Sequence, residues 1–305
     1  MKPALAPQAA SRRIRRWAAK AGGDGHRRNA CRAVLAARGQ NPPGILHGLL
    51  AAALIAGCGG SEPEREVLRV FAASSLTEAF QELAGTFEAA YPEIDVVPVF
   101  AGSQVLRLQI EQGAHADVFA SADQRHLDAL VRAGLVTGGR VFAGNELVVI
   151  VPRDNPAAIT DFADLPRARR LVIGTEHVPA GRYARMALKR AAGRRGTDFE
   201  AAVLASVASE ESNVRLARAK VELGAADAAI VYRTDAVPGR VRVIPLPDGV
   251  NVRADYLMGA LTAASNPEGA ELWIDFAASP AGQAIMTRRG FLAARGLLAG
   301  SAPAR

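Results

Sequence analysis

Small polar residues stand at three places where a short apolar segment gives way to a helical pattern. Ser75 follows the segment 68–73, Ser103 follows the segment 94–100, and the pair Ala180–Gly181 precedes a further helical pattern. The first turn of a helix has unpaired backbone N–H groups and a partial positive charge, so converging helix starts can bind an anion without a charged side chain. This arrangement indicates an anion site built from hydroxyl and backbone donors.

Each of these turns also has a purely structural interpretation. The segment 75–78, Ser-Leu-Thr-Glu, has the form of a capping box, in which the serine hydroxyl bonds a backbone N–H of its own helix. Residues that would indicate an enzyme are absent from the sequence, which has no Gly-x-Ser-x-Gly elbow and no spaced set of His or Cys ligands. We therefore expect a binding protein that catalyses no reaction and needs no cofactor.

Short β-branched segments alternate with helical patterns, which predicts βα units and mainly parallel sheets. The expected strands are 68–73, 94–100, 118–120, 147–152, 171–174, 203–207, 228–232, 241–245 and 256–262. The expected helices are 75–91, 103–113, 123–133, 183–192, 214–223, 268–278 and 281–289.

The order of these elements predicts two lobes with a cleft between them. The pattern builds one α/β lobe, restarts after the apolar strand 147–152, and then returns to the first lobe. The expected division is a leader and signal peptide (1–57), a tether (58–66), lobe one (67–146 and 247–295), lobe two (147–246) and a C-terminal tail (296–305).

Six stretches of the chain resemble the periplasmic molybdate-binding proteins of ABC transporters, in the same order and spacing, over about residues 68–292. They are VFAASSLT at 70–77, QIEQGAHADVF at 109–119, SADQ at 121–124, HVPAGRYA at 177–184, IVYRTDA at 230–236 and GF at 290–291. The resemblance implies an α/β, two-lobed periplasmic binding protein fold of type II. In such a fold each lobe is a mainly parallel sheet flanked by helices, and the ligand lies in the interlobe cleft.

The resemblance also implies a set of ligand-binding residues. In that family two serines of the first lobe, and two backbone amides and a tyrosine hydroxyl of the second, hold a tetrahedral oxyanion. The matching positions are Ser75, Ser103, the N–H groups of Ala180 and Val214, and the hydroxyl of Tyr232. Two departures from the family pattern lie next to these positions: Gln104 stands where a small residue is common, and Ser212–Asn213 stands where an acid is common.

The implied function is capture of molybdate, or of tungstate, for delivery to the permease subunits of an ABC transporter by a monomeric receptor. The alternatives are another tetrahedral oxyanion such as sulfate, or a small organic anion. An organic carboxylate usually calls for an arginine fork in the cleft, and the implied site contains none. A site of neutral donors also predicts an affinity that is nearly constant between about pH 6 and pH 8.

Four other polar residues are expected to have no role in ligand binding. Asp123 should cap or brace the turn at Ser121, and His126 should lie on the surface of a helix. Glu176 and His177 are adjacent in the chain, so their side chains point apart, which does not suit a metal site.

The formal net charge of +7 is concentrated at the N-terminus. Residues 1–57 contain ten Lys and Arg and one Asp, a balance of +9, which leaves −2 for the remaining 248 of the 305 residues. A nucleic-acid partner is therefore not indicated.

An apolar run at 45–57 ends directly before Cys58. The run is too short to span a bilayer and suits a signal peptide. Ile-Ala-Gly-Cys at 55–58 resembles the lipobox of bacterial lipoproteins, which implies a diacylglycerol anchor on Cys58. We expect a periplasmic or extracytoplasmic protein attached to the membrane by this lipid, with a soluble periplasmic protein as the alternative.

Substitution of Cys58 by alanine should abolish lipid attachment, because the thiol that would carry the diacylglycerol is removed. Metabolic labelling with a fatty acid measures this. The control is Cys31→Ala, since Cys31 is the other cysteine of the chain and lies in the part expected to be cleaved. Equal labelling of the Cys58→Ala variant and the wild type would show that the lipobox assignment is wrong.

Overall fold

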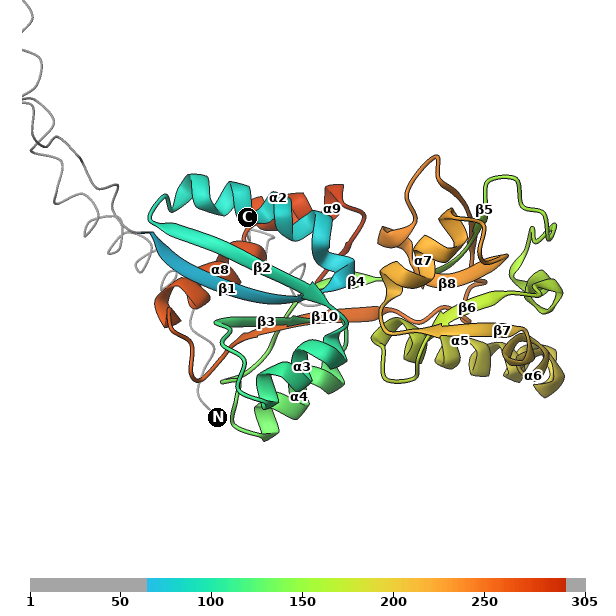
Figure 1. Cartoon of the computed structure of the whole chain (residues 1–305), viewed down its shortest axis with the longest axis horizontal. Helices are drawn as coiled ribbons and strands as arrows, with labels where there is room; N and C mark the ends of the chain where they lie inside the picture. Colours follow the sequence, from blue (N-terminus) through green and yellow to red (C-terminus); the bar gives the residue numbers. More distant parts are fainter. Residues whose placement is uncertain (1–64, 295–305) are drawn as a thin grey trace, which may run out of the picture. The chain divides into compact units, whose positions relative to one another are not determined.

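The computed structural model of the chain describes residues 65–294 and places them in two β-sheets flanked by helices (Figure 1). The predicted leader, Cys58 with its lipobox and the predicted C-terminal tail lie outside the described residues. We call the first sheet with its helices lobe 1 and the second sheet with its helices lobe 2. No helix within residues 65–294 is long and apolar enough to cross a membrane.

Lobe 1 contains a six-stranded sheet with the strand order β11-β4-β10-β3-β1-β2. Its strands are β1 (Glu66–Ala73), β2 (Ile94–Ala101), β3 (Val118–Ser121), β4 (Arg140–Asn145), β10 (Ala254–Ala260) and β11 (Leu292–Ala293). Its helices are the 3₁₀ turn η2 (Ser74–Leu76), α2 (Thr77–Ala90), α3 (Ser103–Glu111), α4 (Gln124–Arg132), α8 (Pro267–Ala278) and α9 (Pro280–Arg288). Helices α2 and α9 cover one face of the sheet, and α3 and α4 cover the other (Figure 1).

Lobe 2 contains a five-stranded sheet with the strand order β7-β6-β8-β5-β9. Its strands are β5 (Leu147–Pro152), β6 (Leu171–Gly174), β7 (Val207–Glu211), β8 (Ala228–Tyr232) and β9 (Val241–Pro245). Its helical segments are η3 (Phe162–Arg167), α5 (Pro179–Arg195), α6 (Thr197–Ala205), α7 (Val214–Glu222) and η4 (Arg233–Asp235).

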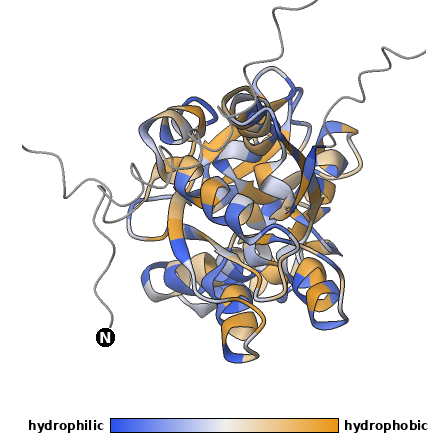
Figure 2. Cartoon of the chain, turned by 90° about the vertical axis from the view of Figure 1, so that its left-hand side faces the viewer, coloured by the Kyte–Doolittle hydropathy of each residue, from blue (hydrophilic) through white to orange (hydrophobic). Residues whose placement is uncertain are grey.

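Apolar residues recur at helical spacing and bury one side of each main helix. In α2, Phe80, Leu83 and Phe87 are fully buried. The rings of Phe80 and Phe87 each lie 5.4 Å from the ring of Trp273 in α8, in edge-to-face geometry that stabilises aromatic pairs. Helices in Figure 2 accordingly show both hydrophobic and hydrophilic residues around their circumference.

The parallel strands of the two lobes end toward the same interface. Strands β2 and β3 pair with β1 in parallel, and β7 and β8 pair with β6 in parallel, as the βα pattern predicts. Strands β10 and β5 run antiparallel to β3 and β8, so each sheet contains antiparallel pairs beside the parallel ones. The reason is the connectivity: a chain that passes from one lobe to the other enters the new sheet at the carboxyl ends of its parallel strands and must run the opposite way.

The sequence-based assignment of secondary structure differs from the structure most clearly in two places. The segment 203–207 is not a strand, because Val203 lies in α6 and the strand β7 begins only at Val207. A short apolar run does not distinguish a buried helix from a strand, and here Val203 and Phe199 are one helical turn apart and both pack inward, with Phe199 5.5 Å from Phe162. Strand β4 was not predicted, because its Gly144 and Asn145 are of types depleted in strands.

Replacement of Gly181 by alanine should destabilise the fold by about 1–3 kcal/mol or more, because the new Cβ would lie 2.1 Å from the carbonyl oxygen of Gly174. Gly193, in the same helix α5, provides the matched control: a Cβ there has no atom within 4 Å, so Gly193→Ala should stabilise by about 0.5–1 kcal/mol. Urea denaturation measures both changes. Equal effects of the two substitutions would contradict the close approach at Gly181.

Candidate functional site

A small cavity lies where the strand ends of the two lobes face each other. All five residues that the sequence resemblance implies as ligands line it, namely Ser75, Ser103, Ala180, Val214 and Tyr232. None of the lining residues carries a charge. The cavity has a volume of about 10 Å³, which is on the scale of a single water molecule. The residues around this space offer neutral hydroxyl and backbone donors to a small anion.

Helix starts supply the backbone donors on the lobe 2 side. Helix α5 begins with Pro179, which has no N–H, so the N–H of Ala180 is the first donor of that helix. Helix α7 begins at Val214, and the side chain of Asn213 accepts from the N–H of Leu216 at 3.1 Å. The Asn213 side chain therefore bonds the N–H of Leu216 and not the N–H of Val214 at the start of the helix. The N–H groups of Ala180 and Val214 have no acceptor within their own helices.

Ser103 is oriented by a hydrogen bond from the backbone of lobe 1. The N–H of Ala122, at the end of β3, donates to Ser103 Oγ at 3.2 Å. Ser103 is buried at the start of α3. Because its oxygen already accepts, its hydroxyl proton can be donated to an acceptor in the cavity.

Ser75 is oriented by a chain of side-chain hydrogen bonds. Asn145 Nδ2 donates to the hydroxyl of Tyr256 at 3.4 Å, and that hydroxyl lies 2.8 Å from Ser75 Oγ. Burial raises the pKa of Tyr256 well above its ordinary value, so the phenol stays protonated and can donate to Ser75. The serine proton is then free to point into the cavity.

The capping box predicted at 75–78 is wrong. Helix α2 begins at Thr77, its N-cap is Leu76, and no side chain caps it. Residues 74–76 form a 3₁₀ turn instead, and Ser75 bonds Tyr256 from a strand 181 residues away in the chain. Sequence analysis did not identify Tyr256 or Asn145, and no local pattern could have done so, because both reach Ser75 only through sheet pairing.

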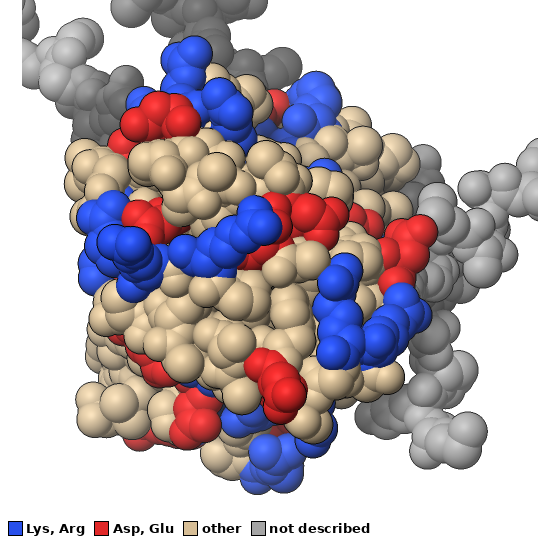
Figure 3. All heavy atoms as spheres, turned by 90° about the vertical axis from the view of Figure 1, so that its right-hand side faces the viewer, with Lys and Arg blue, Asp and Glu red and all other residues tan. Residues whose placement is uncertain are grey.

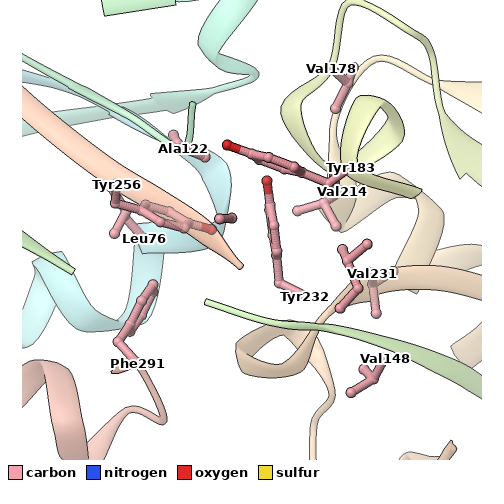
Figure 4. Close-up of a cluster of buried hydrophobic side chains, with 14 of the residues drawn as sticks. Leu76, Ala122, Val148, Val178, Tyr183, Val214, Val231, Tyr232, Tyr256 and Phe291 are labelled. Atoms are coloured by element: carbon pink, nitrogen blue, oxygen red, sulfur yellow. The ribbon is translucent and has the colours of Figure 1, made fainter. Parts of the chain in front are cut away.

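The hydroxyl of Tyr232 is buried and has no hydrogen-bond partner among residues 65–294. Burial raises the pKa of Tyr232 well above its ordinary value, so the hydroxyl remains a neutral donor. Figure 4 shows the hydroxyl ends of Tyr183, Tyr232 and Tyr256 turned toward the same space near Ala122. An unpaired buried hydroxyl costs about 1–3 kcal/mol, so this donor calls for an acceptor in the cavity.

Several side-chain contacts join the two lobes near the cavity. Gln104 Nε2 donates to the carbonyl oxygen of Ser212 at 2.7 Å, so this departure from the family pattern bridges the cleft. Three further contacts are the pairs Asp123–Arg182, His126–His177 and Glu78–Arg215.

The structure corrects one of the expected structural roles and extends another. His126 is not on the helix surface: it is buried, and its Nε2 lies 2.9 Å from the carbonyl oxygen of His177. Burial lowers the pKa of His126, which favours the neutral ring as the donor. Asp123 caps α4 by accepting from the N–H of His126 at 3.3 Å, in line with its predicted role, and also pairs with Arg182 of lobe 2.

No metal centre is evident in the described part of the chain, residues 65–294, where no three His, Cys, Asp or Glu side chains are grouped. The side chains of Glu176 and His177 do not point apart as expected: Glu176 Oε1 and His177 Nε2 are 3.7 Å apart, and both side chains are strongly exposed. Figure 3 shows acidic and basic side chains interspersed on one face of the molecule. In lobe 2, Arg170 pairs with Asp227 at 2.7 Å and Lys220 with Glu211 at 2.5 Å. That face therefore lacks the continuous basic surface typical of nucleic-acid binding.

Asp235 is a buried carboxyl group three residues after Tyr232 that sequence analysis did not identify. Its Oδ2 atom has no hydrogen-bond partner among the described residues. Burial raises the pKa of Asp235 to about 7, against the opposing effect of Arg218 and Arg215. A carboxyl group whose pKa is near neutrality therefore lies three residues from Tyr232, which lines the cavity. The expectation of constant affinity between about pH 6 and pH 8 considered only neutral donors.

Comparison with known proteins relates the chain to bacterial solute receptors. The family model for bacterial extracellular solute-binding proteins matches residues 68–292. The molybdate-binding protein ModA of Mycobacterium tuberculosis is 36% identical over 265 residues, covering 81% of this chain and 97% of that protein.

Solved structures confirm the predicted two-lobed fold. The periplasmic molybdate-binding protein of Azotobacter vinelandii matches with a TM-score of 0.64 and 21% identity, covering 74% of this chain and 98% of that one. The sulfate-binding protein SubI of Mycobacterium tuberculosis matches with a TM-score of 0.67 and 16% identity, covering 77% and 89%. Since receptors named for different anions share this fold, the fold alone does not identify the ligand.

Asp235→Asn should make the folded state more stable than the wild type above pH 7, by up to about 4 kcal/mol for a shift from 3.8 to about 7. The folded wild type binds the Asp235 proton more tightly than the unfolded chain does, so its stability falls as pH rises from about 4 to about 7. Urea denaturation between pH 4 and pH 8 measures the difference. Asp154→Asn, in an exposed turn, is the control, and parallel profiles of wild type and Asp235→Asn would contradict the shift.

Proposed function

The chain belongs to the family of bacterial extracellular solute-binding proteins, and from this premise we propose that it captures molybdate in the interlobe cavity and delivers it to the permease of an ABC transporter. The observation that carries the proposal is the buried hydroxyl of Tyr232, which lines the cavity and has no acceptor among the described residues. A small anion in the cavity would supply that acceptor.

We assign five neutral donors to the anion: the hydroxyl groups of Ser75, Ser103 and Tyr232 and the backbone N–H groups of Ala180 and Val214. Each hydrogen bond to a charged acceptor contributes about 1.5–3 kcal/mol. Ser103 Oγ already accepts from the N–H of Ala122, and Ser75 Oγ can accept from the hydroxyl of Tyr256, so both serines can act on the anion as donors. The anion is bound for transport, and the protein catalyses no reaction on it.

The same donor set argues against the alternative ligands. Protonated phosphate brings a hydroxyl that needs an acceptor, and a site whose polar groups all donate leaves that hydroxyl unpaired. No arginine lines the cavity to form a fork with the carboxylate of an organic anion. Sulfate is the second candidate, because the sulfate-binding protein SubI shares the fold. Tungstate has the charge and shape of molybdate and should bind in the same way.

The proposed function requires the lobes to open and close. We assign lobe 1 to residues 67–146 and 247–295 and lobe 2 to residues 147–246. The two sheets share no strand, and the chain crosses between them at Glu146 and again between β9 and β10, which provides two extended connections for a hinge. We further propose that the receptor acts as a monomer outside the cytoplasm and is anchored by a lipid on Cys58.

Removal of each proposed hydroxyl donor (Ser75→Ala, Ser103→Ala or Tyr232→Phe) should weaken molybdate binding about tenfold to more than a hundredfold, because one hydrogen bond to the anion is lost. Isothermal titration calorimetry of the mature chain measures this. Ser206→Ala is the matched control, since that hydroxyl bonds the carbonyl oxygen of Val203 at the end of α6 and should not affect affinity.

The same titrations with tungstate, sulfate and phosphate test the ligand. Molybdate and tungstate should bind far more tightly than sulfate or phosphate. Unchanged molybdate affinity in a Ser75→Ala, Ser103→Ala double variant would reject the site, and tighter binding of sulfate than of molybdate would reject the proposed ligand.

A further inference from the structure

A buried carboxylate stands directly beside the proposed anion site. Asp123 follows Ala122, which lines the cavity, and only 1% of its side chain is exposed to solvent. Its Oδ1 accepts from the N–H of His126, which caps α4. A second negative charge enclosed in the cavity would repel this carboxylate strongly, because little water is present to screen the interaction.

The charge that compensates Asp123 comes from the other lobe. Arg182, in the first turn of α5, donates to Asp123 Oδ2 from Nε at 2.7 Å and lies 2.5 Å away through Nη2. The guanidinium group also lies 4.5 Å from the centre of the Tyr183 ring, which holds it in place. Arg182 comes two residues after Ala180, whose N–H we assign to the anion. One helix start therefore brings both the anion donor and the compensating cation.

We propose that Arg182 is a positioning residue that neutralises Asp123 only when the lobes are closed, so that an anion is enclosed beside Asp123 only in the closed receptor. This inference rests on the proposed function, since it requires both an anionic ligand and lobes that separate. In the open receptor Asp123 faces water and needs no partner. Closure removes that water and supplies Arg182 instead. Anion affinity then depends on Arg182 through Asp123, although Arg182 does not touch the anion.

A second ion pair across the cleft separates this role from simple attachment of the lobes. Arg215 of α7 pairs with Glu78 of α2 at 2.7 Å. That pair also joins the lobes, and Arg215 lies in the first turn of α7 as Arg182 lies in the first turn of α5. Glu78 is 45% exposed, however, so water can screen it when its partner is lost. An exposed pair contributes little, whereas an unpaired buried charge is strongly unfavourable.

The experiment is a double-mutant cycle on molybdate affinity, measured by calorimetry on the mature chain. Arg182→Gln should weaken binding about 100-fold or more, because Asp123 is left buried and unpaired next to the anion. Asp123→Asn in the same chain should restore affinity to within about tenfold of the wild type. Asparagine keeps the oxygen that caps α4 and removes the charge. Arg182→Lys should keep most of the affinity, and the control Arg215→Gln should lower it by no more than about fivefold.

Three outcomes would overturn the inference. The first is wild-type affinity in Arg182→Gln, and the second is a folded double variant in which Asp123→Asn restores nothing. The third is an equal loss in Arg215→Gln and Arg182→Gln, which would indicate only that cross-cleft contacts hold the lobes together. Thermal unfolding without ligand identifies variants that do not fold. If Arg182→Gln does not fold, the affinities of the double variant and of Arg182→Lys test the inference. Absence of molybdate binding by the wild type would instead reject the proposed function itself.

Discussion

A buried hydrogen-bond donor needs an acceptor, and the hydroxyl of Tyr232 has none among the residues that the structure describes. The donors around it have the same requirement, because the N–H groups of Ala180 and Val214 stand at helix starts and cannot be satisfied within their helices. The two serines add donors, because Ser103 Oγ accepts from the N–H of Ala122 and Ser75 Oγ can accept from Tyr256. The rest of the architecture can be understood as the arrangement that brings these donors to one point and keeps water away.

The fold achieves this through the direction of its strands. In both lobes the parallel strands end at the interface, so every βα turn delivers a helix start or a small polar residue there. The supporting groups lie on two neighbouring strands next to the lobe crossings: β10 enters lobe 1 and runs antiparallel to β3, and β4 leaves lobe 1 and runs antiparallel to β10. Tyr256, near the start of β10, orients Ser75, and Asn145, at the end of β4, orients Tyr256. The antiparallel strands therefore contribute to the site as well as to the hinge.

The charged side chains near the site are separate from the neutral donors that line the cavity. Neutral groups line the cavity, so the proposed dianion would form no salt bridge with the residues around it. Charged side chains lie close to the residues that line the cavity. Asp123 follows Ala122 in the chain, Arg182 comes two residues after Ala180, and the two side chains pair across the cleft. Asp235 lies behind Tyr232, with a pKa raised to about 7 by burial. A site of neutral donors is thus surrounded by charges whose balance depends on how the lobes meet.

The sequence by itself determined those features that depend on residues close together in the chain. The alternation of strands and helices, the helix starts at Ser103 and Val214 and the strand that ends at Tyr232 all follow from local pattern, because hydrophobic periodicity and helix starts act within a few residues. The resemblance of short stretches then indicated which of these turns belong to one site, and all five residues do line one cavity.

Tertiary structure alone decided which distant groups complete the site. From the sequence, Ser75 could be an ordinary helix cap. In the structure its hydroxyl instead lies 2.8 Å from that of Tyr256, 181 residues away in the chain. Asp123 and Arg182 lie in two stretches that were both recognised, but 59 residues separate them, and nothing local specifies that they pair. Segment 203–207 was assigned to the wrong element because a short apolar run does not distinguish a buried helix from a strand, and α6 continues through Ala205 before β7 begins at Val207. Contacts between the lobes, and the loss of water that they cause, cannot be recognised from a local sequence pattern.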